Sequence, residues 1–246
     1  MNKKILLALL SVVCSVAFVN CKKSSSSAPV ADPTMNYFPT TFGKYVIYNV
    51  DSVYYDPAKC KTTEKISQLR YSVSDTFRDD QFRLSYIMDV FTRANSTAAW
   101  TAQGVVYLTN TGSTLEYVQS GLRTIKLVFP VTSTQTWLGN SLISTNDSNY
   151  MFLNNWSYSY QNIGSSYNTS YENFANTVTV LENNETISNT GSNSDAVPYS
   201  LQSYAKEVYA YNVGLIYRET KYLTYSAKKG NCVGGYTLVM QAIDHN

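Results

Sequence analysis

The feature that most constrains the fold is the alternation of apolar and polar residues, or a short apolar run, over segments of strand length. In the first half of the chain these segments are residues 44–56, 82–91, 104–110, 114–120 and 122–130. Residues 110–113, Asn-Thr-Gly-Ser, give a hairpin turn signal between two of them. Because a period of two places successive side chains on opposite faces, the pattern predicts an antiparallel meander.

The second half continues the pattern at residues 176–183, 206–226 and 236–244. Tyrosine supplies 22 of the 246 residues, and such aromatic side chains favour pleated, half-buried surfaces. The best candidate for an amphipathic helix, residues 199–211, carries tyrosines that fit a strand equally well. We therefore expect an all-β fold with a mostly antiparallel, meander-like curved sheet, in the form of an open barrel or a sandwich. Residues 146–174, rich in Asn, Ser and Tyr, could form strands or a long excursion.

The N-terminus reads as a targeting segment. Lys3 and Lys4 precede an apolar run from Ile5 to Val19. A run of about 15 residues is too short to span a hydrocarbon core of about 30 Å, but it fits the central region of a secretory signal. Few or no helices are expected apart from this segment.

Cys21 follows the apolar run and is itself followed by two lysines, four serines and an Ala/Pro stretch. This arrangement resembles a bacterial lipoprotein signal, in which the cysteine thiol receives a diacylglycerol and becomes the first residue. Cys14, the other candidate, lies inside the run with no linker after it. The alternatives are an ordinary secreted protein or an uncleaved anchor. We expect a signal peptide at 1–20, a lipid-anchored Ser/Pro linker at 21–36 and a single β-rich domain at 37–246.

Two cysteines remain in the expected domain, Cys60 and Cys232. Outside the cytoplasm such a pair can oxidise, and a loop this long would contribute roughly 4–5 kcal/mol in the loop-entropy model. Both lie in polar segments that contain Lys, where a covalent link between distant parts of the chain is plausible. The prediction is a Cys60–Cys232 disulfide, with two free thiols as the alternative.

The net charge and the absence of known motifs limit the functions that this chain can have. The chain has 19 basic and 17 acidic residues, and removal of Lys3 and Lys4 leaves a formal charge near zero, so no nucleic-acid partner is expected. His245 is the only histidine and the penultimate residue, which leaves no base for a catalytic triad within the chain's interior. No CxxC pair, calcium loop or nucleotide-binding motif occurs. We predict no metal, no cofactor and no catalytic residues.

Two kinds of side chain remain as candidates for a site. A glycoside hydrolase needs only two acids about 5–10 Å apart, and the candidates for such a pair are Asp75, Asp79, Glu182, Glu207 and Glu219. The segment 155–160 places Trp156, Tyr158 and Tyr160 beside amides and hydroxyls. These rings are candidates for ligand stacking, although core and cross-strand packing explains them as well.

Three segments carry a resemblance to a known group: "YFPTTFGKYVIYNVDSVYYD" at 37–56, "TWLGNS" at 136–141 and "YAKEVYAYNVGLIYRE" at 204–219. They are similar to segments of functionally uncharacterised lipoproteins of Bacteroidota, and the likeness covers nearly the whole expected mature chain. The strand 214–219 is also similar to one in envelope proteins that have an open, curved sheet of the lipoprotein-carrier kind. That second similarity bears on the fold alone.

The resemblance implies a location. In Bacteroidota lipoproteins that reach the cell surface, acidic residues follow the lipidated cysteine closely, whereas here Lys22 and Lys23 follow it and the first acid is Asp32. We expect an outer-membrane protein, acylated for example with palmitate, on the periplasmic face. The preferred function is a non-enzymatic binding or accessory module whose partner, besides the membrane, is an envelope protein or a glycan. The alternatives are a carrier of lipids or hydrophobic ligands and a carboxylate-dependent glycoside hydrolase.

Overall fold

A computed structural model of the chain describes residues 36–189, 199–226 and 232–246. They belong to one compact unit that spans Asp32–Asn246. The expected signal peptide, Cys21 and all but the last residue of the expected linker lie outside the described residues.

The described residues form an all-β structure, as the alternation predicts. The strands are β1 (Tyr45–Asp56), β2 (Lys61–Arg78), β3 (Leu84–Arg93), β4 (Thr101–Asn110), β5 (Thr114–Gln119), β6 (Leu122–Val128), β7 (Thr136–Leu138), β8 (Ser157–Asn168), β9 (Asn173–Asn189), β10 (Tyr199–Ala210), β11 (Gly214–Ser226) and β12 (Val233–His245). Helical structure among these residues is confined to short 3-10 turns such as η2 (Met151–Leu153). The helix candidate at 199–211 is therefore a strand, β10.

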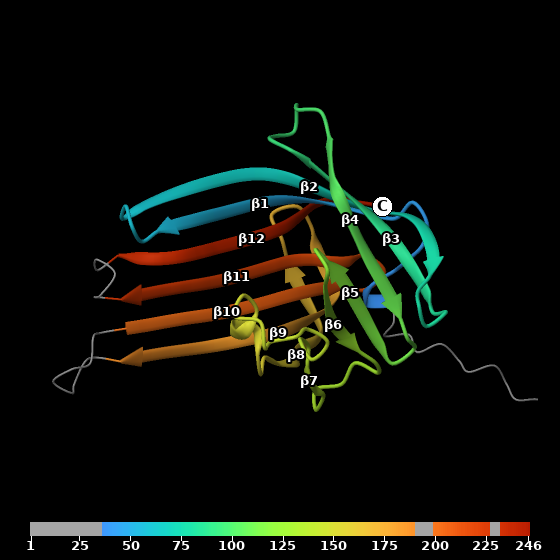
Figure 1. Ribbon diagram of the computed structural model, residues 1–246. Helices are drawn as coiled ribbons and strands as arrows, with labels where there is room; N and C mark the ends of the chain where they lie inside the picture. Colours follow the sequence, from blue (N-terminus) through green and yellow to red (C-terminus); the bar gives the residue numbers. More distant parts are fainter. Residues whose placement is uncertain (1–35, 190–198, 227–231) are drawn as a thin grey trace, which may run out of the picture. The chain divides into compact units, whose positions relative to one another are not determined.

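All twelve strands belong to one antiparallel sheet, shown in Figure 1. Its order is β6-β5-β4-β3-β2-β1-β12-β11-β10-β9-β8-β7, so that two meanders of six strands join where β1 pairs with β12. This confirms the predicted meander, and the single sheet excludes the sandwich form for the described residues. Residues 146–174, for which the sequence left strands or a long excursion as alternatives, contain both. An irregular stretch with η2 comes first, and β8 and the start of β9 follow.

The sheet curls until its two edge regions meet. The backbone N–H of Ile125, on edge strand β6, donates to the carbonyl of Gly139, just after edge strand β7, at 2.8 Å. The Trp137 indole N–H donates to the Ile125 carbonyl at 2.8 Å. Burying unpaired strand edges in this way removes exposed hydrogen-bonding groups from the described part of the sheet.

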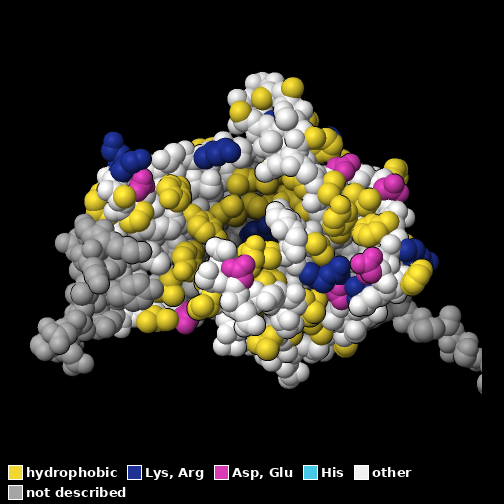
Figure 2. Space-filling model, in the orientation of Figure 1, with side chains coloured by type: hydrophobic (Ala, Val, Ile, Leu, Met, Phe, Trp, Pro, Cys, Tyr) yellow, Lys and Arg dark blue, Asp and Glu magenta, His cyan; other side chains and the backbone are white. Residues whose placement is uncertain are grey.

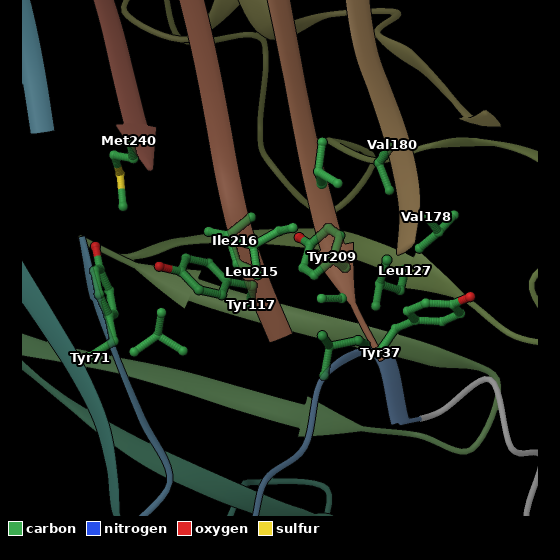
Figure 3. Close-up of a cluster of buried hydrophobic side chains, with 14 of the residues drawn as sticks. Tyr37, Tyr71, Tyr117, Leu127, Val178, Val180, Tyr209, Leu215, Ile216 and Met240 are labelled. Carbon is green, nitrogen blue, oxygen red and sulfur yellow. The ribbon is translucent and has the colours of Figure 1, made fainter. Parts of the chain in front are cut away.

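Alternation along each strand decides which side chains enter the core. On β4, Val106 and Leu108 are fully buried, whereas Val105 and Tyr107 point to the outer face and are 41% and 36% exposed. Figure 3 shows Tyr117 and Leu127, from β5 and β6, among apolar side chains of the strands opposite them; these are Val178, Val180, Tyr209, Leu215 and Ile216. The core is therefore lined by aromatic and β-branched residues, as the composition indicates.

Cys60 and Cys232 are joined by a disulfide, with their Cα atoms 5.3 Å apart. Cys60 lies in the turn between β1 and β2, and Cys232 directly precedes β12. Since β1 and β12 are neighbours in the sheet, the bridge links the β1–β2 turn to the start of the last strand.

Within the described residues, no helix has the length and apolar character needed to cross a membrane.

Candidate functional site

The described surface has a groove of about 670 Å³ on the outer face of β2 to β6. It is called the outer groove below. Its walls combine apolar and charged side chains, which are Phe77, Arg78, Asp79, Asp80, Gln81, Arg83, Ile87, Tyr107, Thr109, Glu116, Val118, Arg123 and Leu142. Its size lies in the range of small-ligand sites.

Strand register brings the apolar residues of the outer groove together. Ile87 on β3 pairs with Tyr107 on β4, and Tyr107 pairs with Val118 on β5. Paired residues of antiparallel strands share a face, so these three side chains form a row across the sheet. Phe77 adds an edge-to-face ring contact with Tyr107, with the ring centroids 5.3 Å apart.

The charged side chains of the groove hold one another in place. Arg83 donates to Asp79 Oδ2 at 2.8 Å and, through its two terminal nitrogens, to both carboxylate oxygens of Glu116 at 2.8 and 3.1 Å. Arg123 also donates to Glu116. The hydrogen bond from Arg83 is the largest influence that lowers the pKa of Asp79. The network fixes both arginines, which limits the ordering entropy a partner must overcome.

Exposed apolar side chains surround this charged centre. Phe82, in the β2–β3 turn, is 82% exposed, and Leu142, in the loop after β7, is 48% exposed. Figure 2 shows basic, acidic and hydrophobic side chains intermixed on the surface formed by β3 to β6. A second hollow of about 320 Å³ shares Arg123 and Leu142 with the outer groove and extends it toward Tyr150. Aromatic and arginine side chains of this kind are typical of binding surfaces.

A second group of charges lies inside the curled sheet. Lys126 Nζ is 2.5 Å from Glu182 Oε1 and 3.0 Å from Glu207 Oε1. Arg218 Nε donates to the same oxygen of Glu207 at 2.7 Å, and the Tyr209 hydroxyl donates to its other oxygen. Glu207 is fully buried and Lys126 is 9% exposed. Two cations and two carboxylates thus neutralise one another in the core.

Two β-bulges help to place these charges. On β6, Ile125 pairs with Glu116 and Leu127 with Leu115, so Lys126 is the extra residue of a bulge. On β9, the register skips Glu182 in the same way, between Leu181 and Asn183. A bulge re-aims a side chain, and here it turns two charged residues toward the core. Glu207 needs no bulge, because it pairs directly with Arg218 across β10 and β11.

The two buried carboxylates have opposite pKa shifts. Burial and the adjacent charge of Glu207 raise the pKa of Glu182 to about 7. Burial also acts on Glu207, but the charges of Arg218 and Lys126 outweigh it and lower the pKa of Glu207 to about 2. Burial alone would lower the pKa of Lys126, whereas the charges of Glu182 and Glu207 raise it. The charges adjacent to each buried group therefore determine the direction of its pKa shift.

The acids proposed for glycoside hydrolysis fall in three environments. Glu182 and Glu207 converge, but on Lys126 in the core rather than across a cleft. Asp79 lies in the outer groove and is paired with Arg83, and Glu219 pairs with Lys221 at 2.8 Å on β11. Asp75 is exposed on β2. Of these five candidates only Asp79 lines the outer groove, so no two of them face each other across it.

The three aromatic candidates belong to the core. Trp156, Tyr158 and Tyr160 are 9%, 1% and 4% exposed. Their polar atoms are used inside the chain: Trp156 donates to the Phe152 carbonyl at 2.9 Å, and the Tyr158 hydroxyl to Asn140 Oδ1 at 3.1 Å. All three rings pack in the core, and Trp156 also lines a hollow of about 140 Å³ beside Asn140 and Asn155.

His245 lies at the edge of β12, where Nε2 is 3.0 Å from Glu172 Oε2. The described residues contain no group of three or more His, Cys, Asp or Glu side chains placed to hold a metal ion.

The sequence did not lead us to predict the outer groove or the buried position of Lys126. The groove joins a turn, five strands and a distant loop, and no local sequence pattern marks it. Lys126 carried a usable signal, since it interrupts the apolar segment 125–130, but the acids that face it lie 56 and 81 residues further along the chain.

Comparisons with known proteins give only distant likenesses. No protein-family model matches the chain, and no curated protein matches it significantly. A solved Bacteroides fragilis protein, assigned as exported and with a YmcC-like fold, is 12% identical with a TM-score of 0.40, and the match covers 85% of this chain and 98% of that one. A Parabacteroides distasonis protein assigned as a lipoprotein is 13% identical with a TM-score of 0.44 and the same coverage. LprF from Mycobacterium bovis is 8% identical with a TM-score of 0.23, covering 87% of this chain and 89% of that one.

Proposed function

We propose that this chain is a lipid-anchored lipoprotein of the cell envelope and acts as a non-enzymatic binding or accessory module through the outer groove. The observation that carries the proposal is the groove itself. It offers exposed apolar side chains around a charged centre that is already ordered by Arg83, Glu116 and Arg123. A preordered site of this kind can hold an envelope protein or a glycan with little entropy loss.

The ion pairs of the buried acids support a binding function over a hydrolase function. The two acids that do meet, Glu182 and Glu207, are neutralised by Lys126 and Arg218 and lie in the core. A hydrolase needs its acids on either side of a bound sugar. In the groove, Asp79 and Glu116 are ion-paired with Arg83 and Arg123, which favours contact with another molecule over acid catalysis there.

The interior also supports binding over a hydrophobic carrier. A carrier requires Leu, Val, Ile and Phe side chains around an open cavity, of about 300 Å³ or more for a small ligand. Two cavities that core side chains line in the described structure hold about 30 and 10 Å³. The outer groove is larger, but six charged side chains line it, which is unfavourable for an acyl chain.

The proposed location follows from the sequence. Lipidation of Cys21 would tether the described sheet through the Ser/Pro linker, and Lys22 and Lys23 favour the periplasmic face of the outer membrane. The tether would hold the groove near a bilayer and raise the local concentration of partners there.

Site-specific photocrosslinking in intact cells tests the groove. A photoreactive phenylalanine analogue replaces Tyr107, which is 36% exposed in the groove. The matched control carries the analogue at Ile66, which is 65% exposed and lies on the same strand as Phe77, about 36 Å away from it along β2. We expect a discrete adduct from position 107 that Arg123→Glu weakens, because that change reverses a charge beside Glu116.

Mass spectrometry of the adduct then distinguishes a protein from a glycan. No adduct at position 107, or the same adducts from positions 107 and 66, would contradict binding at the groove.

A further inference from the structure

A stack of alternating aromatic rings and guanidinium groups lies on the outer face of β2 and β3. The Arg70 guanidinium carbon lies 4.5 Å from the ring centroid of Phe91 and 5.5 Å from that of Trp100. On Trp100, the guanidinium carbon of Arg93 lies 4.2 Å from the ring centroid. The contacts link Phe91 to Arg70, Arg70 to Trp100 and Trp100 to Arg93.

The sheet register builds this stack. Arg70 on β2 pairs with Phe91 on β3, and Gln68 pairs with Arg93. Thr92 pairs with Thr101 at the end of the β3–β4 hairpin, which places Trp100 next to Arg93. Residues 68, 70, 91 and 93 thus share one face of the sheet, opposite to the face on which Tyr71 and Val90 enter the core.

The two arginines form no close ion pair in the described part of the chain. Neither has an ion-pair partner within 4 Å among the described residues. Arg93 Nε donates to Gln68 Oε1 at 2.7 Å, whereas Arg70 Nε is buried with no hydrogen-bond partner in the described structure. Acids on the same face include Asp89, which pairs with Ser72, Asp51, which pairs with Ile66, and Asp244, which pairs with Ile47, the β1 partner of Arg70.

Stacking occupies the flat face of a guanidinium group and leaves its terminal N–H donors available. A cation–π contact uses the flat face of the group, while its N–H donors lie in the plane and point away from the rings. The rings therefore hold two donor forks in fixed orientations. Two cations against one indole also repel each other, and an anion that bridged them would relieve this repulsion.

We propose that Arg70, Trp100 and Arg93 form a binding site for a phosphate group. Phosphate matches the site because its several oxygens can accept from two guanidinium forks and its charge balances them. The phosphate belongs either to a membrane lipid headgroup or to a soluble phosphorylated compound. This site shares no residue with the outer groove and does not depend on the proposed function.

Titration with inorganic phosphate at constant ionic strength, with chloride as the balancing anion, tests the site. The readout is the NMR signals of the Arg70 and Arg93 Nε–H groups and of the Trp100 indole. We expect saturable shifts that acetate does not reproduce. Arg93→Gln should weaken binding by roughly tenfold or more, since it removes a charged donor fork. Arg93→Lys should also weaken it, because it keeps the charge and loses the fork.

The control is Lys65→Gln, which removes an exposed positive charge from the same strand and should leave the affinity unchanged. A second arm uses flotation of the unacylated Cys21→Ser protein, and of Arg93→Gln in that background, with phosphatidylglycerol vesicles. Flotation that Arg93→Gln abolishes assigns the phosphate to a lipid headgroup, and phosphate shifts without flotation assign it to a soluble compound. The proposal is overturned by non-saturable shifts, by equal shifts with acetate, or by equal affinity in Arg93→Gln.

Discussion

The carboxylate of Glu207 is fully buried and accepts hydrogen bonds from Lys126, Arg218 and Tyr209. An ion in the core is tolerated only while its partners remain, because removal of one charge leaves the others without compensation. At the residue scale, this buried network makes the sharpest predictions.

Glu207→Gln should destabilise the protein by about 3–5 kcal/mol, because Lys126 and Arg218 would then share a single carboxylate in the core. Glu219→Gln is the control: it also removes a carboxylate paired with two lysines, but those pairs are partly exposed, and the loss should stay below about 1 kcal/mol. Urea unfolding at pH 7 measures both. Equal losses in the two variants would contradict the assigned role of the buried network.

Glu182 should make stability depend on pH. Its folded-state pKa, about 7, is raised above the ordinary value of 4.5, so the folded protein holds a proton that the unfolded chain has released. Stability is therefore fully present below pH 4.5 and falls as the pH rises toward 7, by a total on the order of 3 kcal/mol. Glu207 has the opposite shift and weakens the fold only as the pH falls from 4.5 toward 2.

Urea unfolding between pH 5 and pH 8 checks this dependence. Glu182→Gln should flatten the curve in that window, whereas Glu219→Gln should not, because the pKa of Glu219 is lowered. A flat curve for the unmodified protein would show that Glu182 is ionised throughout.

At the element scale, the strands were predictable and the contacts between distant strands were not. The alternation at 104–110 predicts which face of β4 is buried, because that property is local to one strand. The bulges at Lys126 and Glu182 are not local, since each depends on the register of a neighbouring strand. For the same reason Tyr158 and Tyr160 could be recognised as β-forming residues, but their burial depends on β6 and the loop around Asn140.

Tyr160 tests how the two edges of the sheet are held together. Its hydroxyl accepts from the Val128 N–H and donates to the Val128 carbonyl, both at 2.8 Å, and so ties β8 to the end of β6. Tyr160→Phe should lower stability by roughly 1–3 kcal/mol, because both backbone groups lose their partner. The control is Tyr204→Phe, whose hydroxyl bonds no described residue. Hydrogen exchange should show faster exchange of the Val128 amide in Tyr160→Phe alone, and unchanged exchange would contradict this role.

At the scale of the whole molecule, a disulfide joins two distant parts of the chain and should add to its stability. The Cys60–Cys232 bridge spans a sequence separation of 172 residues. Replacing both cysteines with alanine should lower stability by roughly 4–5 kcal/mol in the loop-entropy model, which credits long loops most. Mass spectrometry of the mature, non-reduced protein should find neither thiol alkylated. Two alkylatable thiols would contradict the bridge.

The proposed function rests on a second covalent link, the lipid on Cys21, which would keep the outer groove close to a membrane. Metabolic labelling with a radioactive fatty acid tests it most directly, with Cys21→Ser as the loss variant and Cys14→Ser as the matched control. We predict label in the unmodified protein and in Cys14→Ser, both recovered with the membrane fraction, and none in Cys21→Ser. An unlabelled protein recovered free of membranes, or label that persists in Cys21→Ser, would contradict the account.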